Sequence, residues 1–169
     1  MSSKAVTDGL KRVLADSYAL YLKTQNYHWN VEGRHFKQLH ELFQLEYEAL
    51  ALAIDEVAER IRTLGEKAPG SFAEFAKLKT IRDGDSSLGD NAMVKDLHDD
   101  NLAVAKLASA VVKAAQKTGD EVTIGLMVER AAAHEKAAWM LRSSLPTKAE
   151  TAKKTVKGSK SSLRVVAKR

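Results

Sequence analysis

Three of the five histidines in this 169-residue chain fall within one short stretch, YHWNVEGRHFKQLH, at positions 27–40. Imidazole nitrogens serve as general bases and as ligands of transition metals. His28 and His40 lie on either side of a predicted turn at 31–35, where two antiparallel helices would bring them together. His35 follows Gly33 in that turn and is expected to be solvated. Either histidine of the pair alone is more typical of a structural role, but together they indicate a ligand site.

Two carboxylates, Asp55 and Glu59, stand four residues apart in the run IDEVAER and share one helical face. Like charges at this spacing destabilise a helix by about 0.2–0.5 kcal/mol, so a compensating cation is expected. In the structural interpretation Arg60 and Arg62 provide it, with Glu56 and Arg60 forming an i,i+4 pair. In the functional interpretation a bound metal ion provides it.

The distance along the chain constrains how these groups combine. His40 and Asp55 are separated by 15 residues of one predicted helix, which is about 22 Å at 1.5 Å per residue. They therefore cannot bind the same ion within one chain. If two copies of the helix pack antiparallel about a two-fold axis near Tyr47 and Glu48, His40 of one copy meets Asp55 of the other. The spacing predicts a metal site shared between subunits.

Helical periodicity dominates the chain. Apolar residues recurring every three to four positions predict helices over about 6–30, 36–64, 91–117 and 120–145,. Gly65 ends the second helix, and Asp120 is a suitable N-cap for the fourth. The long connection between the second and third helices contains SFAEFAKL, which predicts a short helix. The predicted fold class is all-α, a ferritin-like four-helix bundle with a short helix in the long crossover.

The second helix carries more apolar surface than one bundle core needs. Leu42, Leu45, Ala49 and Leu52 form a row rotated away from the row that contains Phe43 and Leu50,. Either the crossover segment or a second subunit would cover it. The shared metal site favours the second subunit.

The charge distribution divides the chain in two. The net charge is +5, but residues 1–147 hold 19 basic and 21 acidic side chains, whereas residues 148–169 hold 8 basic and 1 acidic. We therefore predict a bundle domain over 1–146 and a basic tail over 147–169. A basic tail without aromatic residues suits contact with DNA phosphates without sequence recognition, and a solubilising tail is the alternative. The predicted DNA-binding residues are Lys148, Lys153, Lys154, Lys157, Lys160, Arg164, Lys168 and Arg169.

Composition narrows the remaining classes. The absence of cysteine excludes thiolate nucleophiles, zinc fingers and disulfide frameworks,. No segment reaches the roughly 20 apolar residues that a membrane span requires. A cytoplasmic protein without a membrane partner is expected.

Several segments resemble one family. H-W-N-V-x-G at 28–33, D-x-x-A-E-R at 55–60, DNAMVKDLHDDN at 90–101 and HEKAAWMLRS at 134–143 resemble Dps, the DNA-binding miniferritin of starved cells. The resemblance implies a dodecameric shell with 23 symmetry that oxidises Fe(II), preferably with hydrogen peroxide, stores Fe(III) mineral and protects nucleoid DNA. It implies ferroxidase centres at two-fold interfaces, with iron ligands on His28, His40, Asp55 and Glu59. It also implies that Trp29 lies beside the centre, as a radical sink or as interface packing.

The resemblance further implies acidic pores near the fourth helix that admit iron. Candidate pore residues are Asp120, Glu121, Glu129 and Glu135, and candidates for mineral nucleation on the inner surface are Glu41 and Glu48. Solvated surface carboxylates explain all six equally well.

Two other functions are consistent with the same fold. A ferritin or bacterioferritin would hold iron inside one bundle through paired E-x-x-H motifs on helices. The literal match, Glu32 to His35, is single and spans a turn. A chromosome-packing shell without iron chemistry is the second alternative, and the presence of all four ligand types argues against it.

Overall fold

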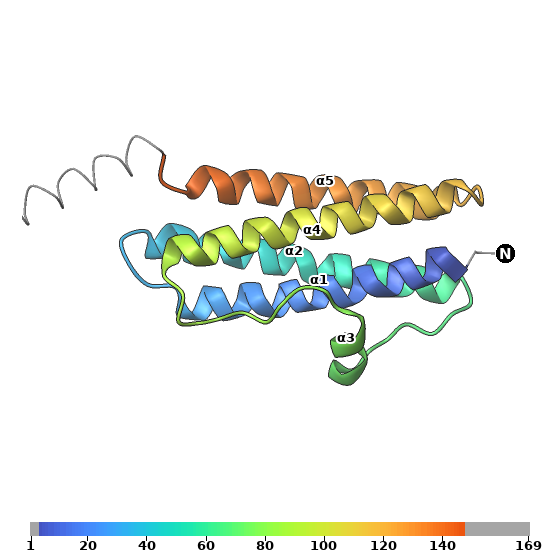
Figure 1. Cartoon of the computed structure of the whole chain (residues 1–169), viewed down its shortest axis with the longest axis horizontal. Helices are drawn as coiled ribbons and strands as arrows, with labels where there is room; N and C mark the ends of the chain where they lie inside the picture. The colour runs from blue at the N-terminus through green and yellow to red at the C-terminus, as the bar shows by residue number, and fades with distance from the viewer. Residues whose placement is uncertain (1–3, 148–169) are drawn as a thin grey trace, which may run out of the picture.

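The computed structural model describes residues 4–147. It contains the helices α1 (Lys4–Asn30), α2 (Phe36–Thr63), α3 (Phe72–Leu78), α4 (Asp90–Gln116) and α5 (Glu121–Ser144). The four long helices lie side by side, and α3 stands outside them on the long connection (Figure 1). No strand occurs within the described residues. The predicted all-α class is confirmed, and each predicted helix end lies within two residues of the observed one.

Local signals explain where the helices begin and end. The Ser71 hydroxyl accepts a hydrogen bond from the Glu74 amide at 3.3 Å and donates one to its carboxylate at 2.7 Å, which is a capping box at the start of α3,. Asp120 accepts a hydrogen bond from the Thr123 amide at 3.1 Å, so it caps α5 as predicted. Gly65 follows α2 with φ of +88°, a conformation that residues with a Cβ rarely adopt,.

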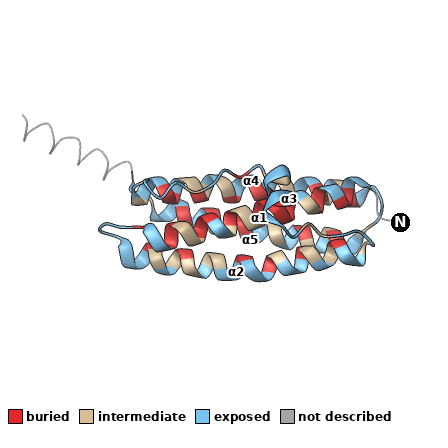
Figure 2. Cartoon of the chain, turned by 90° about the horizontal axis from the view of Figure 1, so that it is seen from below, coloured by how far each residue is buried: buried red, intermediate tan, exposed pale blue. Residues whose placement is uncertain are grey.

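Two clusters of buried side chains form the core along the length of the bundle. Leu10, Val57 and Met127 belong to one cluster, and Phe43 and Leu97 belong to the other. Buried positions follow the inner faces of the long helices, and exposed positions follow the outer faces (Figure 2). No helix of the described chain is both long enough and apolar enough to span a bilayer.

The crossover is fastened to α1. The Asp16 carboxylate accepts hydrogen bonds from the Thr80 amide, from the Thr80 hydroxyl at 2.8 Å and from the Ile81 amide at 3.0 Å. On the same side, the ring of Phe75 in α3 stacks on Tyr18 of α1 with centroids 4.7 Å apart. These contacts hold α3 and the segment after it against α1 (Figure 1).

The crossover does not cover the second apolar row of α2. Leu45 and Leu52 remain 64% and 72% exposed. The interpretation that the crossover segment covers this row is therefore wrong, because the hydrogen bonds of Asp16 direct that segment along α1 instead. A second subunit is the remaining explanation for the row.

Candidate metal centre

The two predicted histidine ligands meet where α1 and α2 join. His28 lies in the last turn of α1 and His40 in the first turns of α2, and the short turn between these helices places the rings face to face. The ring centroids are 3.7 Å apart with an interplanar angle of 19°. His28 is buried and His40 is partly buried. The expected proximity of the two side chains is therefore present within one chain.

Reciprocal hydrogen bonds fix the tautomer of both rings. The Nδ1 of His28 lies 2.8 Å from the carbonyl oxygen of His40, and the Nδ1 of His40 lies 2.8 Å from the carbonyl oxygen of His28. A carbonyl oxygen only accepts, so each Nδ1 carries the proton and donates it. In its neutral form each ring therefore presents an unprotonated Nε2, which is the atom that binds a metal. The two carbonyl groups orient the rings as an outer shell of a metal site commonly does.

Asp55 and Glu59 lie exposed on α2, away from the histidine pair. Within residues 4–147 neither carboxylate forms an ion pair or a hydrogen bond. The predicted compensation by arginine is wrong: Arg60 pairs with Asp120 at 2.6 Å, and Arg62 donates to the carbonyl oxygen of Glu66. These two arginines therefore leave the like charges at i,i+4 uncompensated.

No single described chain assembles a complete metal site. Among residues 4–147 there is no cluster of three or more histidine or carboxylate side chains within ligating reach of one point. This result matches the distance argument, which places His40 and Asp55 about 22 Å apart along one helix. It also gives no support to a di-iron centre inside the bundle, because Glu32 and His35 are both exposed in the 31–35 turn.

Aromatic side chains surround the histidine pair. The ring of Tyr47 meets His28 edge to face at 5.3 Å, and Phe36 lies 5.1 Å from His40. Trp29 follows His28 but is 64% exposed, and no ring contact joins it to the pair within the described chain. Tyr47 is thus a neighbour of the candidate site that sequence reasoning named only as the position of a two-fold axis.

The candidate pore and nucleation residues fall into two groups. Asp120 is occupied by its cap and by the ion pair with Arg60. Partial burial opposes ionisation of Asp120, but the hydrogen bonds from Thr123 and the charge of Arg60 outweigh it and lower the pKa of this carboxyl. The other five candidates are exposed: Glu41, Glu48, Glu121, Glu129 and Glu135. Three of the five have close polar neighbours: Glu41 faces Lys37 at 3.9 Å, Glu129 faces Arg130 at 2.9 Å, and Glu48 accepts from Gln44 at 2.8 Å.

A buried ion-pair network that sequence reasoning missed lies beside the site. The Lys23 ammonium is 1% exposed and contacts Asp96 at 3.0 Å and Asp100 at 2.6 Å. The Tyr27 hydroxyl donates to Asp96 at 2.6 Å. The network joins α1 to α4, and its member Tyr27 immediately precedes His28. It therefore fixes the end of α1 that carries this candidate ligand. Only the chain reversal through the crossover brings these groups together, so no local sequence signal announces them.

A second missed feature is a groove of about 350 Å³ between α2 and α5. Both carboxylate oxygens of Glu46 are buried there without a hydrogen-bond partner in the described chain, and burial raises the pKa of this carboxyl to about 8. Across the groove, the Nδ1 of His134 donates to Asn101 at 2.8 Å. Burial and then the charge of Arg130 lower the pKa of His134 to about 4. The position of Glu46, four residues after Leu42 and four before Leu50, was the available sequence signal.

Comparison with known proteins agrees with this architecture. Residues 7–148 match the model of the ferritin-like domain. The DNA protection during starvation protein of Porphyromonas gingivalis is 36% identical over 136 residues, which cover 80% of this chain and 86% of that protein.

Solved structures are similar over the whole bundle. Dps from Staphylococcus aureus superposes with a TM-score of 0.84 at 26% identity, over 87% of this chain and 99% of that one. The Dps protein of Vibrio cholerae O1 is described as a member of a broad superfamily of ferritin-like diiron-carboxylate proteins. It superposes with a TM-score of 0.79 at 33% identity, over 82% of this chain and 87% of that one.

The helix order, the crossover and the family match define a ferritin-like protein, a class in which iron binding is the general property. Within that class, the extent and identity of the matches are decisive. The chain belongs to the Dps family of iron-storage and DNA-protection proteins.

Proposed function

We propose that this protein is a DNA-binding miniferritin that oxidises Fe(II) with hydrogen peroxide at sites shared between subunits and stores the Fe(III) as mineral. His28 and His40 of one copy and Asp55 and Glu59 of a second copy bind the substrate iron. The observation that carries the proposal is the histidine pair, whose Nδ1 atoms are both held by carbonyl groups 2.8 Å away. Such a pair offers two Nε2 lone pairs to a metal. Two ligands do not complete a metal site, so further ligands must come from elsewhere.

The donor set suits Fe(II). Neutral imidazole and carboxylate are ligands of iron, zinc and manganese, whereas thiolate is absent from the chain,. Two negative carboxylates stabilise Fe(III) more than Fe(II), so the site favours the product of oxidation. Two Fe(II) ions each give one electron to a peroxide, whose O–O bond breaks, and two protons complete two water molecules. This stoichiometry releases no hydroxyl radical.

We infer that the shared sites form in a closed shell, a dodecamer with 23 symmetry. The exposed row that contains Leu45 and Leu52 lies between the ligand positions of α2 and supports a two-fold contact there,. Glu41 and Glu48 are candidates for mineral nucleation inside the shell, and Glu121, Glu129 and Glu135 for the pores that admit iron. The cap and ion pair of Asp120 make it a weaker candidate than these three.

Hybrid shells test the shared site. One partner carries His28→Ala and His40→Ala, and the other carries Asp55→Ala and Glu59→Ala. In a random 1:1 mixture half of the dimers are hybrids, and each hybrid restores one of its two sites. About a quarter of the wild-type rate of peroxide-driven Fe(II) oxidation should therefore return. Verified hybrids that recover nothing would disprove the shared assignment.

A matched control separates the site from a general loss of histidine. His35 is exposed, and the His98 ring, on α4, forms a hydrogen bond with Asp99 at 2.9 Å. A shell that carries His35→Ala and His98→Ala should oxidise Fe(II) at the wild-type rate. Loss of oxidation in this control as well would move the metal centre away from the pair.

We further propose that residues 147–169 bind DNA, although residues 148–169 lie outside the described structure. Each tail carries eight basic side chains. The tails of one shell would bind DNA together, because once one tail is bound the shell holds the others at high effective concentration near the same DNA. Binding should ignore base sequence, and its log–log slope with salt should be about −0.9 per phosphate neutralised.

Two variants test the tail. Deleting residues 147–169, or replacing its eight lysines and arginines by glutamine, should abolish DNA retardation in a gel and leave Fe(II) oxidation unchanged. The glutamine variant keeps the length of the tail and isolates its charge. Full DNA affinity in both variants would refute the proposal and direct attention to Lys4, Lys11 and Arg12.

A further inference from the structure

Glu46 places a carboxyl group at a core position of the bundle. It follows the buried Phe43 by three residues and precedes the buried Leu50 by four, so it lies on the inner face of α2,. Both of its carboxylate oxygens are buried, and neither has a hydrogen-bond partner in the described chain. A buried polar group without a partner destabilises a fold unless a ligand satisfies it. The groove between α2 and α5 therefore contains unused oxygen ligands.

His134 lines the same groove from α5, between the buried Met127 and Ala138. Its Nδ1 donates to the side-chain oxygen of Asn101 at 2.8 Å. The amide nitrogen of Asn101 donates in turn to the carbonyl oxygen of Leu97 at 2.9 Å, which fixes the orientation of the amide. In its neutral form the His134 ring therefore has an unprotonated Nε2, and no hydrogen bond within the described chain uses that atom. An outer hydrogen bond of this kind orients many metal-binding histidines.

The charges around the groove are compatible with a bound cation. Besides Glu46, three titratable residues line it, all on α5: Arg130, His134 and the exposed Lys136. The one lining residue from α4 is a neutral amide. Burial and then the charge of Arg130 lower the pKa of His134 to about 4, so protons do not compete for its Nε2 near neutral pH. The Arg130 guanidinium also opposes a nearby cation, but Glu129 at 2.9 Å and Glu56 at 4.0 Å offset its charge.

We propose that Glu46 and His134 bind one divalent transition-metal ion in the groove between α2 and α5. The carboxylate of Glu46 and the Nε2 of His134 are the protein ligands, and water molecules complete the coordination. Carboxylate and imidazole are ligands that iron, cobalt and zinc accept, and such a site binds Co(II) more tightly than Fe(II). The site is separate from the proposed shared centre and does not depend on it. Both ligands come from one chain, and Glu46 is about 9 Å along α2 from His40.

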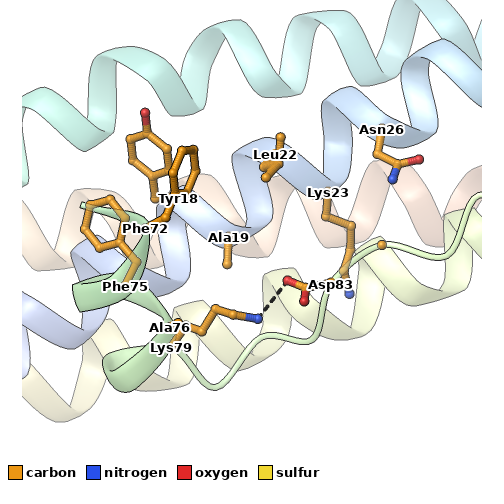
Figure 3. A pocket seen from close by; sticks show the side chains of 11 residues that line it. Tyr18, Ala19, Leu22, Lys23, Asn26, Phe72, Phe75, Ala76, Lys79 and Asp83 are labelled. Carbon is orange, nitrogen blue, oxygen red and sulfur yellow. Dashed lines mark hydrogen bonds and ion pairs between the residues drawn. The ribbon is translucent and has the colours of Figure 1, made fainter. Parts of the chain in front are cut away.

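A second hollow, beside α1, has no such unused ligand. It has a volume of about 290 Å³ and lies between α1, α3 and the crossover (Figure 3). The charged side chains that line it are all paired: Lys79 with Asp83 at 2.8 Å, and Lys23 with Asp96 at 3.0 Å and with Asp100 at 2.6 Å. Within residues 4–147, only Glu46 has buried side-chain oxygens without a hydrogen-bond partner. The unused ligands thus assign the metal to the groove between α2 and α5.

Metal binding should release a proton, because the ion binds the ionised form of Glu46. Burial raises the pKa of this carboxyl in the metal-free protein to about 8. At pH 7 about 0.9 proton should therefore leave for each ion bound, and the apparent affinity should rise about tenfold between pH 6 and pH 7. Titration calorimetry in two buffers that differ in ionisation enthalpy measures the number of protons released.

The site is tested on the full-length protein, freed of metal with a chelator and dialysed against Co(II), whose visible absorption reports its ligands. Wild-type protein should bind one more Co(II) per chain than Glu46→Gln, which keeps the shape of the side chain but cannot ionise. Glu32→Gln, in the exposed 31–35 turn, is the matched control and should bind as wild type does. A chain with His28→Ala and His40→Ala should keep the groove site. If that chain loses all Co(II) absorption, the signal belongs to the histidine pair and the groove site is wrong.

Two further measurements locate the ion. An anomalous-scattering map at the cobalt edge should show a peak between the Glu46 carboxylate and the Nε2 of His134. Zn(II) should raise the thermal midpoint of wild-type protein by several degrees more than that of Glu46→Gln, because an ion that binds only the folded state stabilises it. Equal Co(II) binding by wild type and Glu46→Gln, with only water between the two side chains in the map, would overturn the site. A peak that His134 does not contact, or binding without proton release, would overturn it as well.

Discussion

Glu46 faces the groove between α2 and α5 and should make the stability of the protein depend on pH. Both of its carboxylate oxygens are buried without a hydrogen-bond partner in the described chain. Burial raises the pKa of this group from 4.5 to about 8. In the folded protein Glu46 is therefore neutral at pH 7, whereas in the unfolded chain it is ionised. Folding at this pH takes up a proton.

The sign of the pH dependence follows from that proton. Because its folded-state pKa is raised, the stability that Glu46 contributes is greatest below pH 4.5 and falls as the pH rises toward 8,. Each pH unit within this window costs about 1.4 kcal/mol. The loss is about 3 kcal/mol at pH 7 and about 4 kcal/mol at pH 8, and it approaches about 5 kcal/mol at higher pH.

Replacing Glu46 by glutamine removes this dependence, because the amide has nearly the same shape and does not titrate. The Glu46→Gln variant should be close to wild type in stability at pH 5 and more stable at pH 8, by about 4 kcal/mol. At about 2–4 °C per kcal/mol for a chain of this size, the difference in thermal midpoint should widen by roughly 10 °C. Circular dichroism melts at one fixed protein concentration measure it, since assembly contributes to the midpoint.

Glu32→Gln is the matched control, because Glu32 is exposed in the 31–35 turn. Its melting difference from wild type should not change between pH 5 and pH 8. Infrared spectroscopy gives an independent readout: wild-type protein at pH 7 should show a protonated carboxylic acid band that Glu46→Gln lacks. A difference between Glu46→Gln and wild type that stays constant with pH, together with no such band, would refute the buried neutral carboxyl.

Three further substitutions test the packing. A Cβ on Gly9 would lie 2.7 Å from the Cγ2 of Val111, so Gly9→Ala should destabilise by about 1–3 kcal/mol,. Gly125 has no atom within 4 Å of its Cβ position, so Gly125→Ala should stabilise the exposed helix by about 0.5–1 kcal/mol,. The two glycine variants should therefore shift the thermal midpoint in opposite directions, and shifts in the same direction would contradict the argument. Asp16→Ala should release the crossover from α1 and destabilise the protein by about 1–3 kcal/mol, because the amides of residues 80 and 81 lose their hydrogen-bond acceptor,. Unchanged hydrogen exchange at those two amides would exclude this role of Asp16.

The sequence predicted features that depend on local periodicity and short turns. Helix ends came from single residues such as Asp120 and Gly65, whose effects act within one turn of helix. The histidine pair was predictable because a connection of only five residues makes the two helices antiparallel neighbours, which brings His28 and His40 side by side. Both kinds of inference need only a few residues of chain.

Features that depend on the packing of distant helices were not predictable in the same way. Arg60 had Glu56 available four residues earlier, yet it pairs with Asp120, 60 residues later in the chain, at 2.6 Å. An exposed i,i+4 pair contributes only about 0.3–0.5 kcal/mol, so any better-buried partner supplied by the fold displaces it. Lys23 finds Asp96 and Asp100 for the same reason. Local charge patterns thus identify which side chains are charged but not which of them pair.

The proposed sharing of the site between two subunits has an energetic consequence. Leu45 and Leu52 are largely exposed in the single chain, and full burial of one leucine side chain contributes about 1.5–3 kcal/mol. In the proposed shell each such contact occurs twice about the two-fold axis, so this row would stabilise a dimer, and the same rotation would bring Asp55 and Glu59 toward the histidines of the other copy. Iron affinity and assembly are then linked. Leu45→Glu and Leu52→Glu, which touch no proposed ligand, should weaken both the shell and Fe(II) binding. A variant that dissociates into monomers but binds Fe(II) as tightly as the shell would break this link.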